Sequence, residues 1–537
     1  MNMKTYKYLA VAFTALLSFS SCDSFLTTEL VDSTPTDNYY KTPEQAYAAL
    51  TGCYNGLNLI WADGVSFPLA SEVMSDNCLG GGGTSDELGY QMLNQFDKSI
   101  APTKYSQFNA NWSAYYQAIY RCNVLLQNIE KVNWGTETAL KTQYEAEARF
   151  LRAYFYFDLV RLFEKVPLVT EPTSERIPQA EPAETYAQIM SDLRFASDNL
   201  PATTYSATPN GRVTKWAAES LLARAYLFYS GYYGVAEIGG ETKTTALAAV
   251  EDVITNSGHG LVGDYTTLWP AASTAQSKTY AGEDNKEVIF SIKYTLTGDY
   301  NGNICGNRWL IMTGLREQSV YPYGLGWGFC TIDPKLYNAF SATDTRKFGS
   351  AIAIDDEDLE FSKQSNTREY TGYFMKKYSP EVDEDGVSLA QKNGGAAGTN
   401  SFMVSQYQDY FVIRYADVLL MAAELGSANA QTYFDEVRGR AGLTSLAPTK
   451  ENILAERRLE FSGEGLRYWD LLRYYGQSNL DGFAAALIAN TSTNLLDSSH
   501  PTLSADKIKA TRGFTQIPQD EITLIGNSAI LTQNAGW

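Results

Sequence analysis

Three consecutive blocks of apolar and charged residues near the C-terminus have helical spacing. They occupy residues 411–425, 430–443 and 453–473. In the first block Val418, Leu419 and Ala422 recur at intervals of three and four, which places one apolar stripe along a helix. The second block ends at Gly442, a residue type that commonly follows the last helical turn. The pattern predicts a helix for each block.

Charges alternate along the third block. Glu464, Arg467, Asp470 and Arg473 change sign every third residue, on one surface of a helix or its capping turn. Such a run could supply a general acid and base, or it could form a structural lattice of ion pairs. Each acid has an arginine within reach, which lowers a carboxyl pKa, whereas a catalytic acid needs a raised one. We therefore interpret the run as structural.

Helical spacing also fills the region from Thr42 to about residue 256. Thr42 is a suitable N-cap with Pro43 at the first helical position. Further helices are predicted at 111–130, 138–163, 182–199, 213–232 and 244–255. The tripeptide Arg-Ala-Tyr begins at Arg152 and again at Arg224, a separation close to twice a unit of about 34 residues. The pattern favours a tetratricopeptide-like stack of antiparallel helix pairs over a non-repetitive helical bundle.

The helical pattern fades between residues 257 and 400, where Gly, Asp, Ser and Thr become dense. The alternating run 286–294 predicts a strand, and 333–340 predicts a short helix. The runs at 351–358 and 385–400 are interpreted as loops. Because binding residues are often carried on loops that a rigid scaffold positions, this lobe is the expected place for a ligand.

The N-terminus is typical of a signal sequence rather than of a folded element. Lys4 and Lys7 precede a twelve-residue, mainly apolar core, and F-S-S-C then places Cys22 after small residues. The core is too short to span a bilayer. We expect a lipoprotein signal, with Cys22 acylated as the first mature residue; an ordinary secretory signal is the alternative. No later run approaches 18 apolar residues, so the mature protein is expected to be tethered and not to span the membrane.

Composition and motifs exclude several classes of function. The net charge of −19, with no basic run, argues against a nucleic-acid partner. After Cys22 an odd number of cysteines remains, so they cannot all form disulfides with one another. No cluster of Cys and His residues in the sequence indicates a metal site. The chain lacks the G-x-S-x-G, H-E-x-x-H and Walker sequences. We expect no cofactor and no catalysis, although a two-carboxylate glycosidase remains formally open.

Aromatic content is the unusual feature. The 37 tyrosines outnumber the 24 phenylalanines and 9 tryptophans together. Tyr and Trp have a flat apolar face and a polar edge, which suits carbohydrate, although core packing accounts for most such rings. The densest mixture of rings, glycine and asparagine lies between residues 300 and 329. The ligand-binding candidates there are Trp327, Tyr300, Tyr323, Tyr321, Trp309, Arg308 and Asn307.

Several stretches resemble the SusD/RagB family, the surface lipoproteins with which Bacteroidetes capture nutrients. R-Y-A-D-V-L-L-M-A-A-E, V-R-G-R-A-G-L and E-R-R-L-E-F-S-G-E-G-L-R-Y-W-D-L-L-R are similar to its C-terminal signature. The opening C-D-S-F-L, the helix T-P-E-Q-A-Y-A-A-L-T-G-C-Y-N-G-L, and the closing I-P-Q-D-E-I and Q-N-A-G-W are also similar. The resemblance therefore covers the mature chain in order.

The resemblance implies a mostly α, tetratricopeptide-like scaffold and a ligand site. Trp327 stands where the starch-binding member has a stacking tryptophan, and Tyr300 stands near a second ligand aromatic. That member carries further stacking tryptophans on the loop that here reads Gly80–Gly83. The resemblance thus implies a glycan other than starch, with Asp76 and Asn77 as hydroxyl contacts, unless the glycines only form a flexible loop.

The resemblance also implies a location and a partner. The protein would be a surface-exposed lipoprotein of the outer membrane that passes captured glycan to a SusC-like TonB-dependent transporter. Peptide capture, as in the RagB branch, and a scaffold lid that binds nothing are the alternatives. The expected organisation is a signal peptide at 1–21, a tether at 22–41, a helical scaffold at 42–256, a ligand-binding lobe at 257–400, scaffold helices at 401–475 and a packing segment at 476–537.

Overall fold

A computed structural model describes residues 39–59, 66–207, 211–299, 303, 305–362, 366–395 and 403–537. The predictions for the signal peptide, for Cys22 and for Tyr300 lie outside the described residues. None of the helices that are described is long and apolar enough to cross a membrane.

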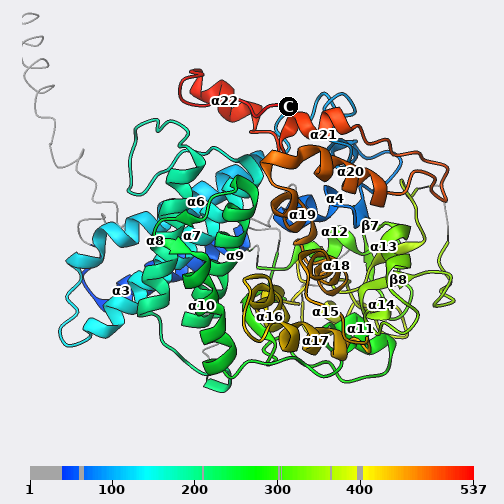
Figure 1. Ribbon diagram of the computed structural model, residues 1–537, viewed down its shortest axis with the longest axis horizontal. Coiled ribbons are helices and arrows are strands. Elements are labelled where there is room, and N and C mark those ends of the chain that lie inside the picture. The colour runs from blue at the N-terminus through cyan, green and yellow to red at the C-terminus, as the bar shows by residue number, and fades with distance from the viewer. Residues whose placement is uncertain are drawn as a thin grey trace, which may run out of the picture.

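A row of long helices forms one side of the molecule (Figure 1). In order they are α3 (Pro43–Leu59), α6 (Asn109–Asn128), α7 (Thr138–Phe163), α8 (Pro182–Asn199), α9 (Lys215–Tyr233) and α10 (Lys243–Asn256). Each helix packs against the next in this order. The predicted helices are confirmed, and α7 and α8 have the predicted bounds.

The stack continues after a long insertion. Helix α10 packs against α16 (Tyr415–Glu424), which pairs with α17 (Ala430–Arg440). Two further helices, α18 (Lys450–Glu460) and α19 (Arg467–Tyr475), pack on α16 and α9. The lobe between α10 and α16 is therefore an insertion between helices that touch. This arrangement confirms the mostly α, tetratricopeptide-like fold.

Two of the three C-terminal blocks were wrongly predicted as single helices. The first block begins with the strand β10 (Tyr410–Arg414), which pairs antiparallel with β4 (Val288–Ile292). Periodicity cannot separate a short apolar run of this kind from a buried helix. The third block breaks between α18 and α19, where Gly463 and Gly465 take φ values of +78° and +72°. Such angles end a helix.

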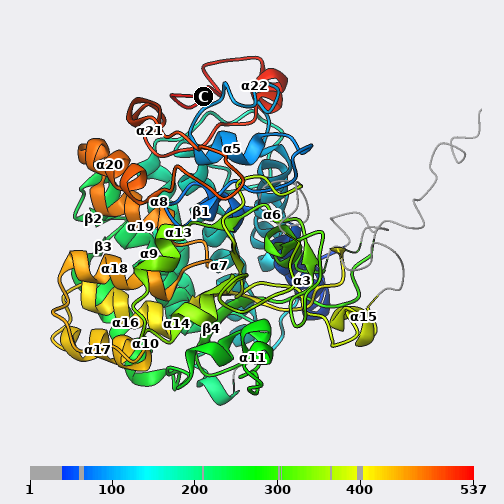
Figure 2. The same cartoon turned by 90° about the vertical axis from the view of Figure 1, so that its right-hand side faces the viewer.

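The lobe contains short elements from distant parts of the chain. Its four-stranded sheet has the order β1 (Cys78–Leu79), β7 (Thr331–Ile332), β9 (Tyr373–Met375) and β8 (Ala351–Ala353). The run at 351–358 thus begins as a strand, not as the predicted loop, because its apolar residues pair with β9. Figure 2 shows the early elements β1 and α5 (Gly89–Asn94) among much later ones.

The other short elements of the lobe connect these strands to the scaffold. The helices are α4 (Phe67–Val73), α11 (Pro270–Ala275), α12 (Arg308–Thr313), α13 (Pro334–Ala339), α14 (Arg346–Ser350) and α15 (Leu389–Lys392), with the 3₁₀ turn η3 (Tyr265–Leu268). The predicted helix at 333–340 is confirmed as α13. Strands β5 (Leu315–Arg316) and β6 (Leu325–Gly326) form a parallel pair. Outside the lobe, β2 (Glu237–Ile238) pairs with β3 (Glu241–Thr242) between the scaffold helices α9 and α10.

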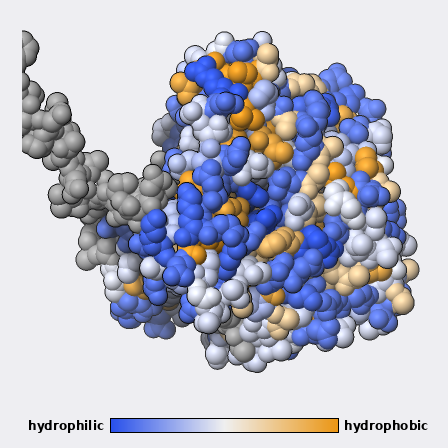
Figure 3. All heavy atoms as spheres, turned by 90° about the vertical axis from the view of Figure 1, so that its left-hand side faces the viewer, coloured by the Kyte–Doolittle hydropathy of each residue, from blue (hydrophilic) through white to orange (hydrophobic). Residues whose placement is uncertain are grey.

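The C-terminal segment lies along the top of the molecule in Figure 1. It contains α20 (Leu480–Asn490), α21 (Ala505–Thr511) and α22 (Gln519–Ile525). Its backbone is tied to the end of α7, where the Thr515 amide donates to the Leu162 carbonyl at 2.7 Å. Figure 3 looks onto the outer face of the scaffold, where hydrophilic side chains predominate and apolar ones gather near the top.

The charged residues of the C-terminal blocks form a buried lattice of ion pairs. Arg414 donates to both carboxylate oxygens of Glu464 at 2.8 Å and also pairs with Glu287 and Glu460. Burial acts to raise the pKa of Glu460, yet the surrounding arginines hold it well below its usual range. The Glu460 carboxylate stays ionised because arginines surround it. The lattice therefore agrees with the structural interpretation of the alternating charges.

The cysteines of the described chain are free thiols. Cys53, Cys78, Cys122 and Cys330 are buried, and Cys305 is partly exposed. Within the same residues, no group of three or more His, Cys, Asp or Glu is arranged to hold a metal ion.

Candidate functional site

The aromatic residues predicted to bind a ligand together lie in three different environments. Trp327 is half-buried at the surface, next to Phe329. Tyr321 and Tyr323 line a separate pocket, which has no contribution from Trp327. Trp309 is fully buried. The sequence neighbours therefore do not form one site.

Three half-buried rings form a continuous surface around Trp327. Its ring centroid lies 5.4 Å from that of Phe329, and the Phe329 ring stacks on Tyr90 at 4.6 Å. These three residues are called the Trp327 platform below. Phe329 and Tyr90 also line a hollow of about 530 Å³, together with Asp86, Glu87, Lys104, Tyr105, Ser106 and Gln107. The platform therefore joins flat apolar faces to a rim of polar side chains.

Backbone hydrogen bonds connect the platform to the end of α12. The Trp327 amide donates to the Ile311 carbonyl at 2.7 Å, and the Phe329 amide donates to the Met312 carbonyl at 2.8 Å. Between them the Gly328 amide donates to the Gly314 carbonyl at 3.1 Å. Three consecutive hydrogen bonds hold the two rings in place before any ligand binds, which reduces the ordering cost of binding.

The glycine loop packs directly beside this backbone. The Gly82 amide donates to the Gly328 carbonyl at 2.7 Å, and all four residues from Gly80 to Gly83 are buried. A Cβ on Gly81 would lie 2.1 Å from the Gly328 oxygen, and one on Gly83 would lie 2.1 Å from an Arg316 nitrogen. The interpretation of this loop as merely flexible is therefore wrong. Glycine is needed because the two backbones approach so closely.

Replacing Gly81 by alanine is expected to lower the free energy of unfolding by about 2–4 kcal/mol, since a strained φ and a steric clash add. Gly81 has φ +51°. Gly135 is a matched control, with φ +52° and open space around it. Gly135→Ala should lower the free energy of unfolding by only about 1–2 kcal/mol, the cost of a positive φ for alanine. Chemical denaturation followed by tryptophan fluorescence measures the stability of both variants. Equal losses in the two would contradict the conclusion that Gly81 is needed because its backbone lies so close to the Gly328 carbonyl.

A buried arginine connects the glycine loop to the platform. The Arg316 guanidinium donates to the Trp327 carbonyl at 3.1 Å and pairs with Asp86 at 3.3 Å and with Glu317 at 3.0 Å. Asp86 in turn accepts the Gly83 amide at 2.6 Å. Arg368 donates to the carbonyls of Thr84 and Asp86. Asp86 and Glu317 thus both pair with Arg316, and these ion pairs hold the surface around the platform in place.

Asp76 and Asn77 do not reach a ligand, contrary to the expectation. Both are buried. The Asp76 carboxylate accepts Arg467 at 2.7 and 2.8 Å, and the Asn77 carbonyl accepts Arg458 at 3.0 Å. Burial acts to raise the pKa of Asp76, but Arg467 and Arg458 lower it overall. These residues fix the start of the glycine loop to α18 and α19.

Asn307 and Trp309 are also structural. The Asn307 side chain caps α12 by accepting the Trp309 amide at 3.0 Å, and it donates to the Gln408 carbonyl at 2.8 Å. Trp309 is part of the hydrophobic core. The expected ligand contacts at these two positions are therefore wrong. Arg308 is half-buried, and its contact with a ligand stays a prediction.

Sequence reasoning missed Phe329, Tyr90, Arg316 and Asp86. Phe329 lies in the same aromatic run as Trp327 and carried the same signal. Tyr90 lies far away along the chain, and only the pairing of β1 with β7 brings its region to the platform. Nothing in the sequence marked Arg316 as the residue that connects the two segments.

Comparison with known proteins agrees with the fold. Residues 82–227 match the family described as "Starch-binding associating with outer membrane", and residues 357–537 match the "SusD family". The chain is 27% identical to SusD-like protein P2 of Formosa agariphila over 501 residues, 88% of this chain and 91% of that one. It is 26% identical to a SusD-like protein of Bacteroides ovatus over 495 residues, 87% and 82% of the two chains.

Solved structures agree over nearly the whole length. A "Laminarin binding SusD-like protein" superposes with a TM-score of 0.71 and 27% identity, covering 93% of this chain and 100% of that one. Surface glycan-binding protein A from Bacteroides uniformis gives a TM-score of 0.70 and 27% identity, covering 92% and 100%. With the helical-repeat fold and the matched sequence regions, these likenesses show that the chain belongs to the SusD/RagB family.

Proposed function

We propose that this protein captures an oligosaccharide or polysaccharide on the Trp327 platform, without chemical change. The observation that carries the proposal is the platform itself, which consists of three half-buried rings beside a polar hollow. Backbone hydrogen bonds hold the segment that carries Trp327 and Phe329, and Tyr90 stacks on Phe329. Two structural relatives with 27% identity support it, since one is described as laminarin-binding and the other as a surface glycan-binding protein.

The chemistry of the surface suits a sugar chain. The C–H face of a pyranose ring packs on an aromatic face, while its hydroxyls need donors and acceptors at the edge. Glu87, Lys104, Ser106 and Gln107 supply such groups around the hollow. The platform is open at the surface, so a polymer can lie across it without threading an end. Among the acids near the platform, Asp86 and Glu317 pair with Arg316, and Glu87 pairs with Lys104.

The proposed location and partner follow from the family. Cys22 would carry the lipid that holds the protein on the outer membrane. The captured glycan would pass to a SusC-like TonB-dependent transporter. Because the acylated cysteine gives only an anchor, the folded part would remain outside the lipid.

A binding screen tests the proposal. The soluble chain without residues 1–22 is run through native gels that contain laminarin, xyloglucan, starch, mannan or mucin, and retarded cases are measured by calorimetry. We expect at least one polysaccharide to retard the protein and to bind in the micromolar range. Failure with every polysaccharide, followed by binding of a peptide digest, would replace glycan capture with peptide capture.

A further inference from the structure

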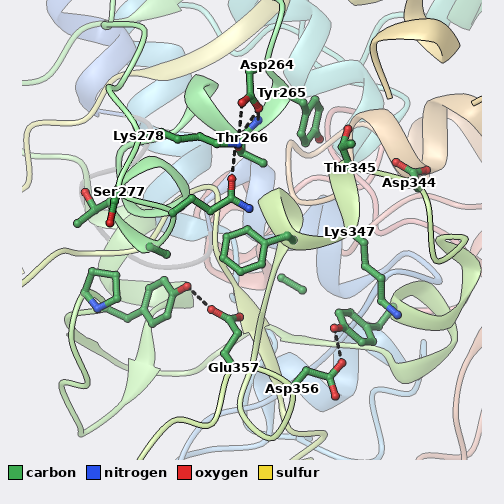
Figure 4. A pocket seen from close by; sticks show the side chains of 18 of the residues that line it. Asp264, Tyr265, Thr266, Ser277, Lys278, Asp344, Thr345, Lys347, Asp356 and Glu357 are labelled. Atoms are coloured by element: carbon green, nitrogen blue, oxygen red, sulfur yellow. Dashed lines mark hydrogen bonds and ion pairs between the residues drawn. The ribbon is translucent and has the colours of Figure 1, made fainter. Parts of the chain in front are cut away.

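A second pocket, of about 870 Å³, lies in the lobe away from the platform (Figure 4). Four parts of the chain meet there: the stretch around η3 and α11, the turn at 321–323, the stretch from α13 to the residues after β8, and Arg440 at the end of α17. It is called the Tyr321 pocket below. None of the three platform residues lines it.

Tyrosine rings wall the pocket and are held in place by carboxylates. Tyr321 is 46% exposed, although it is a large apolar ring. The Tyr323 hydroxyl donates to Glu357 at 2.5 Å, and the Tyr337 hydroxyl donates to Asp356 at 2.6 Å. Tyr337 also stacks on Tyr373 at 4.2 Å. Tyr321 is therefore the open ring of the pocket, and the buried rings of Tyr323 and Tyr337 are fixed parts of its wall.

Hydrogen-bonding groups face one another across the pocket. Figure 4 shows Asp264, Thr266 and Lys278 on one side and Lys347 and Asp356 on the other. Lys278 donates to Thr266 at 3.0 Å and pairs with Asp264 at 2.7 Å. Opposite them the Lys347 ammonium lies 4.1 Å from the centroid of the Tyr337 ring. A ligand between the two sides would meet both donors and acceptors.

The pocket lining carries four acidic and three basic side chains. Most are already paired: Asp344 with Arg346, Glu357 with Lys376, and Asp264 with Lys278. Arg440 is held by Glu287 and Glu460. Lys347 and Asp356 remain, one of each sign, on either side of Tyr337. No cationic surplus is left for a phosphate or a polyanion, so the lining favours a neutral ligand.

We propose that the Tyr321 pocket is a second carbohydrate-binding site, which takes a short neutral oligosaccharide. Its size lies within the range of ligand pockets, about 300–1,000 Å³. Tyr321 supplies the stacking face, and Lys278, Lys347 and Asp356 supply hydroxyl contacts. The site goes beyond the proposed function, because it does not need a ligand at Trp327. Two sites on one chain would let a polysaccharide bind more tightly than its fragments, since the second contact is intramolecular.

Stoichiometry tests this proposal. Native mass spectrometry and calorimetry are run on the soluble chain with laminarihexaose, cellohexaose, xylohexaose, maltohexaose and mannohexaose. The variants are Tyr321→Ala, Asp356→Ala and Trp327→Ala. Asp356 is exposed, so its replacement should leave the fold intact if Tyr321→Ala disturbs the turn. Tyr120→Ala is the matched control, because Tyr120 is 56% exposed on the distant helix α6.

We expect the wild type and Tyr120→Ala to bind two equivalents of at least one hexasaccharide. Each pocket variant should weaken one of the two sites at least tenfold, and Trp327→Ala should weaken the other. A single equivalent that is lost in Trp327→Ala and kept in both pocket variants would overturn the second site alone. Two equivalents in both pocket variants would also overturn it. No binding of any hexasaccharide would overturn it as well, whereas the polysaccharide screen decides the proposed function separately.

Discussion

The variant Trp327→Ala is expected to bind its polysaccharide about 30 to 1,000 times more weakly than the wild type, a loss of about 2–4 kcal/mol. Trp327 lies at one end of the platform, where its half-buried ring is tilted by 50° against Phe329 and packs against the edge of the core. Removing the indole ring takes away the largest stacking face and exposes more of Phe329 to water. Calorimetry with whichever polysaccharide retards the wild type measures the loss.

Two controls accompany this prediction. Trp537→Ala removes a tryptophan that is also half-buried but packs on the C-terminal segment, where its indole N–H donates to the Phe514 carbonyl at 2.7 Å. It should leave the affinity unchanged. Trp327→Phe keeps a flat face and should recover part of the binding. An unchanged affinity in Trp327→Ala, or an equal loss in Trp537→Ala, would remove the platform from the function.

The second large effect concerns stability. Arg414→Met is expected to lower the free energy of unfolding by about 3–5 kcal/mol, because three buried carboxylates each lose one of the cations that pair with them. Arg414 is 1% exposed and faces Glu287, Glu460 and Glu464. Its loss also removes the ion pair that links β10 to the turn between α18 and α19, although the Tyr410 hydroxyl still donates to the Glu464 carbonyl at 2.6 Å. Chemical denaturation at neutral pH measures the change.

A surface ion pair provides the comparison for Arg414. The side chain of Lys165 is 39% exposed, and its partner Glu181 is 67% exposed. Lys165→Met should cost only about 0–1 kcal/mol, because water already solvates both charges. If Arg414→Met were no more destabilising than Lys165→Met, the lattice would contribute nothing measurable to the fold.

The helices of the scaffold could be predicted from the sequence because their signals are local. Apolar spacing at three and four and the N-cap before Pro43 depend only on neighbouring residues. Helices α7 and α8 accordingly have the predicted bounds. The run at 410–414 could not be assigned in this way. Its strand exists because β4, from a distant part of the chain, lies beside it.

The candidate site was harder to predict than the fold. The sequence pointed to Trp327 through its glycine-rich, aromatic surroundings, and the structure places that ring half-exposed on a platform. It did not separate Tyr321 from Trp327, because residues close in sequence can face different cavities, and here the turn at 321–322 and the strand β6 lie between them. It could not reveal that Asp76 is paired, since Arg467 lies 391 positions away.

By itself, then, the sequence determined the helical-repeat architecture, the family and the absence of a recognised catalytic motif, all of which depend on local patterns read in order. The tertiary structure decided which rings are open, which carboxylates are neutralised and which segments meet. Burial and ion pairing decide those properties, and both depend on contacts between residues that are far apart along the chain. The Trp327 platform and the Tyr321 pocket therefore became visible as two sites only after folding.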